Sequence, residues 1–174
     1  MAVLAGIYVW TAYNRFVTLN ESISNQWAQV ESQYQRRFDL IPNLVSSVQG
    51  IMKQEQAVFG ELAAARAQYS GAAGTNERAE AATQVEGALA RLLAIMENYP
   101  ELKSAGTVQT LMAQLEGTEN RISVERMRYN DFVRSLNVMV KRIPGRWLAS
   151  WFGFGEGSYF EAAEGAEEVP EVVL

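Results

Sequence analysis

Residues 26–50 read QWAQVESQYQRRFDLIPNLVSSVQG, a stretch in which a helical apolar stripe, a double arginine and a proline occur together. Its apolar side chains recur at steps of three and four residues, the spacing that places them on one face of a helix. The stripe consists of Trp27, Val30, Tyr34 and Phe38 before Asp39, and of Ile41, Leu44, Val45, Val48, Ile51 and Met52 after it. These two apolar faces predict the core of an all-α protein.

Asp39 and Pro42 predict that the long helix kinks or restarts between its two apolar faces. An aspartate can accept hydrogen bonds from the free amides of a new first turn. Proline is tolerated in such a turn because the amide hydrogen that it lacks would have no helical acceptor there. We therefore expect a hinge at residues 39–42.

The same stretch resembles the LemA family of bacterial membrane-anchored helical proteins, whose pattern runs roughly W-x-Q-[VI]-x-x-Q-x-x-R-R-x-D-L-I-P-N-L-V-x-x-V-x-G. The matching residues are Trp27, Gln29, Val30, Gln33, Arg36, Arg37, Asp39, Leu40, Ile41, Pro42, Asn43, Leu44, Val45, Val48 and Gly50. One position departs from the pattern, because the family usually has a histidine where this chain has Phe38. The resemblance implies an anchored helical protein, and it implies no imidazole chemistry at this position.

Composition excludes several classes of function. The chain has 174 residues, 48% of them hydrophobic, which is enough for one core. It has no cysteine and no histidine, so thiolate nucleophiles, the commonest general base and the commonest transition-metal ligands are absent. A net charge of -5 argues against nucleic acid as a partner. We predict no catalytic residue, no cofactor and no metal site.

Residues 1–19 predict an N-terminal membrane anchor. No charged side chain precedes Arg15, and residues 2–19 would extend roughly 27 Å as a helix, close to the thickness of the hydrocarbon core. The expected anchor residues are Val3, Leu4, Ile7, Trp10, Tyr13 and Phe16. The alternative is an apolar helix buried in the bundle or in an oligomer. The resemblance favours a single-pass anchor in the bacterial plasma membrane. The positive charge of Arg15 after the anchor weakly favours an orientation with the bundle on the cytoplasmic side.

Residues 20–155 predict an antiparallel helical bundle. The first helix is expected to continue through the hinge to Tyr69, where the small, glycine-rich residues 70–75 predict a turn. The remaining long helices are a second one capped by Asn76 and ending before Pro100, and a third one between Thr107 and Pro144. The sequence therefore predicts one long N-terminal helix followed by a helical hairpin.

The C-terminal part of the chain predicts a hydrophobic cap and an acidic tail. Trp147, Leu148, Trp151, Phe152 and Phe154 are expected to cap the bundle, with an interfacial membrane contact or a partner-binding patch as alternatives. Counting antiparallel helices puts this cap at the end remote from the membrane, or near the hinge. The tail, residues 156–174, is expected to fold back along the basic third helix or to remain solvated.

Arg36, Arg37 and Asn43 form a candidate partner surface beside the apolar stripe. The structural interpretation is that an arginine pairs with Asp39 or with a carboxylate of the third helix, while Asn43 satisfies backbone groups at the hinge. The functional one is that the arginines present paired donors to an anionic protein partner. Arg36 lies about 17 residues beyond the anchor, or roughly 25 Å, which argues against lipid contact.

These observations favour a non-enzymatic, membrane-anchored scaffold or adaptor. It would assemble with itself as a homo-oligomer or with a membrane protein partner. The alternative that the resemblance implies is a membrane-remodelling protein that oligomerises on the bilayer. A hydrolase built only from carboxylates is the third hypothesis. It would need two acids in one concave pocket, and the best-placed acids are Glu31, Asp39 and Glu55.

Overall fold

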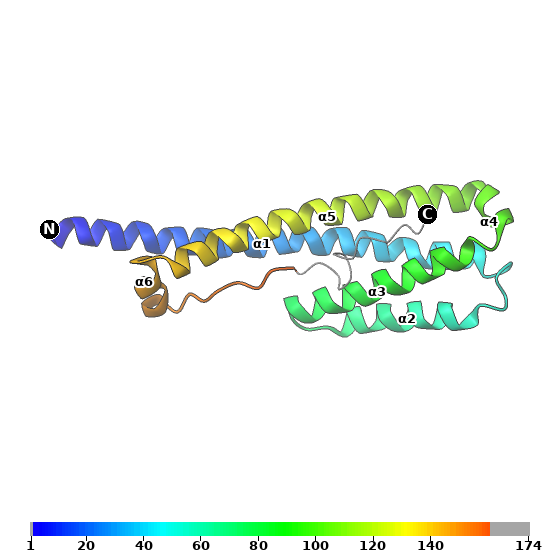
Figure 1. Ribbon diagram of the computed structural model, residues 1–174, viewed down its shortest axis with the longest axis horizontal. Helices are drawn as coiled ribbons and strands as arrows, with labels where there is room; N and C mark the ends of the chain where they lie inside the picture. Colours follow the sequence, from blue (N-terminus) through cyan, green and yellow to red (C-terminus); the bar gives the residue numbers. More distant parts are fainter. Residues whose placement is uncertain (1, 161–174) are drawn as a thin grey trace, which may run out of the picture.

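The computed structural model describes residues 2–160 as an elongated bundle of α-helices, with no strand among them (Figure 1). The helices are α1 Ala2–Val48, α2 Gln56–Gly71, α3 Thr75–Met96, α4 Pro100–Ser104, α5 Gly106–Lys141 and α6 Gly145–Phe152. The all-α fold class predicted from the sequence is confirmed. Residues 161–174, which make up most of the predicted acidic tail, lie outside the described residues.

The longest helix, α1, runs through residues 39–42 without a break, so the predicted restart is wrong. Pro42 is exposed and leaves the Phe38 carbonyl without a helical donor. The buried side chains of Phe38, Ile41 and Leu44 continue one apolar face across this defect and hold the helix together. Asp39 caps no new turn. Instead, its carboxylate accepts a hydrogen bond of 3.1 Å from the Gln35 amide one helical turn earlier.

The chain first reverses at residues 49–55, which the sequence had assigned to the interior of a helix. The amides of Ile51 and Met52 both donate to the carbonyl of Val48, each at 3.0 Å, and form a tight turn. Glycine in a helix interior is unfavourable, and Gly50 opens this turn. Met52 is fully buried because the turn directs it back into the core. The predicted continuous helix up to Tyr69 is therefore wrong, and α2 is a separate helix.

The later boundaries agree more closely with the sequence. The turn predicted at residues 70–75 is confirmed, although Gly74 occupies the position before α3 that had been assigned to Asn76. Glu77 in the first turn of α3 accepts a hydrogen bond of 3.0 Å from the amide of Ala73. Helix α3 ends before Pro100, which begins the short α4, and α5 starts next to Thr107.

The long helices α1 and α5 lie side by side in antiparallel directions, and the hairpin of α2 and α3 covers the distal half of α1 (Figure 1). Their apolar faces meet in one core. Its most deeply buried members are Val30, Tyr34, Ile41, Leu44, Val48, Met52, Leu62, Ala82, Val85, Leu89, Leu92, Leu102, Ile122 and Val133. The apolar stripe predicted in residues 26–50 thus supplies about a quarter of the buried residues of this core.

Helix α6 lies beside the N-terminal part of α1, so the predicted position of the aromatic cap at the remote end is wrong (Figure 1). The additional reversal at residues 49–55 inverts the direction of every later long helix, and α5 therefore returns toward the N-terminus. A second, smaller core joins the helices there. It contains Ala12, Phe16, Leu136, Leu148 and Ala149.

Candidate functional site

Arg37 belongs to a polar network inside the bundle, so its assignment to an exposed partner surface is wrong. It is 8% exposed and forms an ion pair with Glu119 of α5. Its Nη1 atom lies 3.8 Å from Oε1 of Glu86 on α3. Arg126 of α5 donates to both carboxylate oxygens of Glu86, at 3.0 and 3.2 Å, and to the hydroxyl of Tyr34. The network connects α1, α3 and α5.

The ionisation of this network follows from its burial. Burial, and secondarily the negative charge of Glu86, raises the pKa of the Tyr34 hydroxyl above its ordinary value. Burial also lowers the pKa of the Arg37 guanidinium, while Glu86 acts in the opposite direction. Tyr34 is therefore a neutral hydroxyl that accepts a hydrogen bond from a cation. This arrangement fixes the register of three helices and matches the structural interpretation of the double arginine.

Arg36 and Asn43 point away from the core and remain candidates for a partner. Arg36 lines a shallow hollow of about 310 Å³ between α1 and α5, together with Arg121. The two arginines come from different helices and give this hollow a positive charge. The backbone carbonyl of Asn43 accepts a hydrogen bond from the Ser47 hydroxyl at 2.7 Å, within the uninterrupted α1.

The three acids considered for catalysis each have a structural partner. Glu31 forms an ion pair with Arg78 of α3. Glu55 accepts a hydrogen bond of 3.3 Å from the Tyr99 hydroxyl, and Asp39 accepts from the Gln35 amide. Over residues 2–160, no group of three or more acidic side chains is placed to hold a metal ion. None of these three acids lines the hollows described in this section.

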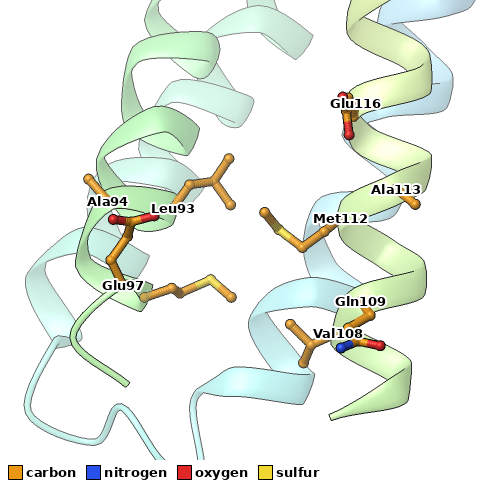
Figure 2. Close-up of a pocket in the computed structure, with 9 residues that line it drawn as sticks. Leu93, Ala94, Glu97, Val108, Gln109, Met112, Ala113 and Glu116 are labelled. Atoms are coloured by element: carbon orange, nitrogen blue, oxygen red, sulfur yellow. The ribbon is translucent and has the colours of Figure 1, made fainter. Parts of the chain in front are cut away.

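An apolar groove of about 660 Å³ lies between the C-terminal half of α3 and the start of α5. Leu93 of α3 and Met112 of α5 point toward one another across it, and Glu97 and Glu116 lie along its edges (Figure 2). Sequence reasoning missed this groove because Leu93 and Met96 have the same spacing as ordinary core residues. Its lining can receive apolar side chains, and its charged groups are the carboxylates of Glu97 and Glu116.

The N-terminal end of α1 carries exposed apolar side chains. Val3 is 76% exposed, Leu4 67%, Ile7 51% and Trp10 67%. Phe16 had been assigned to the same anchor, but it is fully buried and stacks on Phe154 with a ring-centre distance of 5.0 Å. Phe16 is thus a core residue.

Within residues 2–160, none of the helices contains a run that is long and apolar enough to cross a membrane. The predicted single-pass helix over residues 2–19 is therefore not supported. Asn14 and Arg15 lower the mean hydropathy of this segment, and Thr11 adds a further polar group.

The predicted aromatic cap divides into two groups. Leu148 is buried in the second core, and Phe152 packs edge-on against Tyr13 with a ring-centre distance of 5.0 Å. Trp147 and Trp151, by contrast, are 66% and 77% exposed. The phenylalanines and Leu148 thus attach α6 to α1, whereas both tryptophans face away from the bundle.

Comparison with known proteins shows the family of this chain. The LemA family profile matches residues 26–173, which is most of the chain. The chain belongs to the LemA family. The resemblance in residues 26–50 is therefore confirmed. LemA relatives include magnetosome protein MamQ 2 of Paramagnetospirillum magneticum, which is 27% identical over 86% of this chain. Another is magnetosome protein MamQ of Magnetospirillum gryphiswaldense, 28% identical over 85% of the chain.

This LemA chain covers 64% of the length of each of these two relatives. The residues matched by the family profile, 26–173, include those of the buried network and of the aromatic helix α6. The word magnetosome in these names describes those two proteins.

Proposed function

We propose that this LemA protein is a non-enzymatic helical scaffold or adaptor that attaches to the bacterial plasma membrane by one end of its bundle. The observation that carries the proposal is the exposure of Val3, Leu4, Ile7 and Trp10 on the part of α1 that projects beyond the other helices (Figure 1). Contiguous apolar side chains at the tip of an otherwise amphipathic rod are typical of an interaction with lipid or protein.

Lipid is the occupant that this end fits best. Full burial of a valine, leucine or isoleucine side chain contributes roughly 1.5–3 kcal/mol, and several such residues lie within three helical turns. The first acidic residue of the chain is Glu21, so no negative charge on α1 opposes entry of residues 2–20 into the headgroup region. The long α1–α5 pair would then extend away from the bilayer and present its distal surface to partners.

Self-assembly or docking of a membrane protein forms the second part of the proposed function. The exposed Arg36 and Asn43 are candidate contact residues on the distal half of α1. Arg36 with Arg121 would favour an acidic segment of the partner. Arg37 has no part in this surface because its guanidinium is used inside the bundle.

Vesicle flotation tests the membrane attachment. The full chain is compared with Leu4→Glu and Ile7→Glu variants, which place a charge in the exposed apolar end. Met127→Glu is the matched control, because Met127 is 60% exposed on α5 in the middle of the bundle. We expect the two α1 variants to remain in the dense fraction and the control to float. Equal flotation of all variants, or no flotation of the unchanged protein, would contradict the proposal.

The alternative function is membrane remodelling by a protein that oligomerises on the bilayer. We consider this alternative because two relatives are named as magnetosome proteins. Electron microscopy of the same vesicles separates the two functions. A scaffold would leave the vesicles spherical, whereas a remodelling protein would produce tubules or constrictions whose number rises with the protein concentration.

A further inference from the structure

Helix α6 has one face attached to the bundle and one face open. Leu148 and Ala149 are buried against α1 and α5, while Trp147 and Trp151, one helical turn apart, share the exposed face. Trp151 stacks on the neighbouring Phe152 with a ring-centre distance of 5.6 Å, yet both tryptophan rings remain largely exposed. Tryptophan is enriched where one side of a surface is apolar and the other is wet, as at the boundary of a bilayer.

The position of α6 is fixed rigidly relative to α1. Phe152 packs on Tyr13 and Phe154 stacks on Phe16, each with a ring-centre distance of 5.0 Å. At the start of α6, a Cβ atom on Gly145 would collide with the backbone carbonyl of Met139, so only glycine allows this close turn. The exposed tryptophans are therefore held at the level of Tyr13 along the rod.

This level agrees with the attachment of α1 to a membrane. From Tyr13 to Val3, α1 rises about 15 Å, or half of the roughly 30 Å hydrocarbon core. If the tip of α1 enters one leaflet to that depth, α6 lies at the boundary between the headgroups and the acyl chains. The two features would then contact the same leaflet at different depths.

Charges around α6 point to the kind of lipid. The protein has a net charge of -5, but residues 138–152 contain Lys141, Arg142 and Arg146 and no acid. Lys141 is neutralised by Glu156 at 2.9 Å, whereas Arg142 and Arg146 are exposed. Arg142 and Arg15 also line one hollow of about 350 Å³ between α1 and the α5–α6 junction, together with Tyr8 and Ile143. Two guanidinium groups beside apolar side chains suit a lipid phosphate.

We propose that α6 is an interfacial helix that binds anionic phospholipid, with Trp147 and Trp151 in the headgroup boundary and Arg142 and Arg146 directed to phosphate. The proposal deepens the proposed function and rests on it, since both place the same end of the bundle at the membrane. It adds a second contact, one that selects the lipid charge and limits how deeply α1 enters.

The chain has four tryptophans, which allows a direct test. Two variants retain Trp27, which is half-buried against the core, together with either Trp10 or Trp151, and the other tryptophans are replaced by phenylalanine. A reference variant retains Trp27 alone. Each is mixed with vesicles of phosphatidylcholine and phosphatidylglycerol whose acyl chains carry bromine, which quenches nearby tryptophan. Circular dichroism verifies that each variant is folded.

We expect bromine to quench Trp151 and Trp10, and to leave Trp27 unchanged. Quenching of Trp10 without Trp151 would overturn the role of α6 and leave the proposed attachment intact. Quenching of neither would contradict both. If Trp151 is instead shielded from acrylamide without vesicles, and the shielding increases with protein concentration, a second copy of the chain occupies this face and the proposal fails.

Combined substitutions provide the second measurement. Trp147→Ala with Trp151→Ala should lower the affinity for anionic vesicles about tenfold or more, since each tryptophan buries a large area. Met127→Ala, an equally exposed apolar residue on α5, should leave the affinity unchanged. Arg142→Gln and Arg146→Gln, combined with Arg15→Gln in the hollow that Arg142 lines, should abolish the preference for phosphatidylglycerol over phosphatidylcholine. Retained affinity in the tryptophan variant, or a retained lipid preference in the arginine variant, would contradict the proposal.

Discussion

The side-chain amide of Asn137 on α5 forms two hydrogen bonds with the backbone of Gly157. Its Oδ1 atom accepts from the Gly157 amide at 2.8 Å, and its Nδ2 atom donates to the Gly157 carbonyl at 3.0 Å. Asn130 repeats this pattern with Phe160, at 2.9 and 3.1 Å. Asn130 and Asn137 are seven residues apart, a rise of about 10.5 Å along a helix. Gly157 and Phe160 are three residues apart, about 10 Å in an extended chain, so the spacing of the two asparagines matches that of their partners.

These paired hydrogen bonds hold residues 153–160 along the bundle as a strap. Phe160 at its end stacks on Trp27 with a ring-centre distance of 5.3 Å and packs edge-on against Tyr129. Its ring also faces the Arg126 guanidinium at 5.3 Å, and so connects the strap to the buried network. The strap therefore covers the tryptophan with which the apolar stripe begins.

Asn137→Ala should release the strap. Asn137 is buried, and the substitution leaves the amide and the carbonyl of Gly157 without their partners, which costs about 1–2 kcal/mol of unfolding free energy. Urea unfolding measures this loss, and limited proteolysis should show faster cleavage within residues 153–160. Asn43→Ala, at an exposed position on α1, is the control. Equal stability and equal cleavage of the two variants would refute the role of Asn137.

Arg37→Ala and Arg36→Ala should differ greatly in stability although the residues are adjacent. Loss of the buried Arg37 removes the ion-pair partner of Glu119 and the second cation near Glu86, which keeps Arg126, and should cost about 2 kcal/mol. Loss of the exposed Arg36 should change the unfolding free energy by no more than about 0.5 kcal/mol. Chemical denaturation of both variants measures the difference. Similar values would show that the network contributes nothing to the fold.

Pro42→Ala should stabilise the protein. The alanine amide would supply the helical hydrogen bond that the Phe38 carbonyl lacks, while the unfolded chain would gain some conformational freedom. The net gain should be about 1–2 kcal/mol, visible as a higher melting temperature. If the variant were less stable than the unchanged chain, Pro42 would have a structural role that a continuous α1 does not explain.

Stability should fall as the pH rises above 10. The pKa of Tyr34 is raised in the folded protein, so its proton is lost first from the unfolded chain, and deprotonation favours unfolding. The stabilisation is complete below the ordinary tyrosine pKa and disappears as the pH approaches the folded value. Tyr69 and Tyr129 are shifted in the same direction by burial, so Tyr34→Phe should reduce the slope without abolishing it. Urea unfolding between pH 8 and 11 measures this slope, and an unchanged slope in the variant would contradict the assignment.

The sequence predicted the helices that depend on local pattern and periodicity. The apolar stripe containing Val30, Tyr34 and Phe38 lies in the core, and the turn near residues 70–75 lies where its glycines indicated. Asp39 and Pro42 led to the wrong prediction of a helix restart because they are local signals. The buried residues on both sides of them keep α1 continuous. The missed reversal at Gly50 had a larger effect, since it inverted the direction of every helix that follows.

The candidate site was less predictable because it depends on contacts between distant residues. Of the adjacent Arg36 and Arg37, only Arg37 faces the core, where it meets Glu86 on α3 and Glu119 on α5. Both glutamates are far from the arginines in the sequence. The same holds for Phe16. Its place in an apolar segment predicts an anchor residue, whereas the distant Phe154 stacks on it in the fold. The exposed residues Val3, Leu4, Ile7 and Trp10 could be found from sequence alone, since they precede the first charge of the chain.

The most direct test of the central claim measures which part of α1 enters lipid. Because the chain has no cysteine, one can be introduced singly by Leu4→Cys, Ile7→Cys or Ser32→Cys and labelled with a polarity-sensitive fluorophore. With anionic vesicles, the account predicts a blue-shifted, brighter emission from the labels at positions 4 and 7 and no change at position 32, on the exposed surface of the bundle. Emission at positions 4 and 7 that stays the same with and without vesicles would contradict membrane attachment through this end.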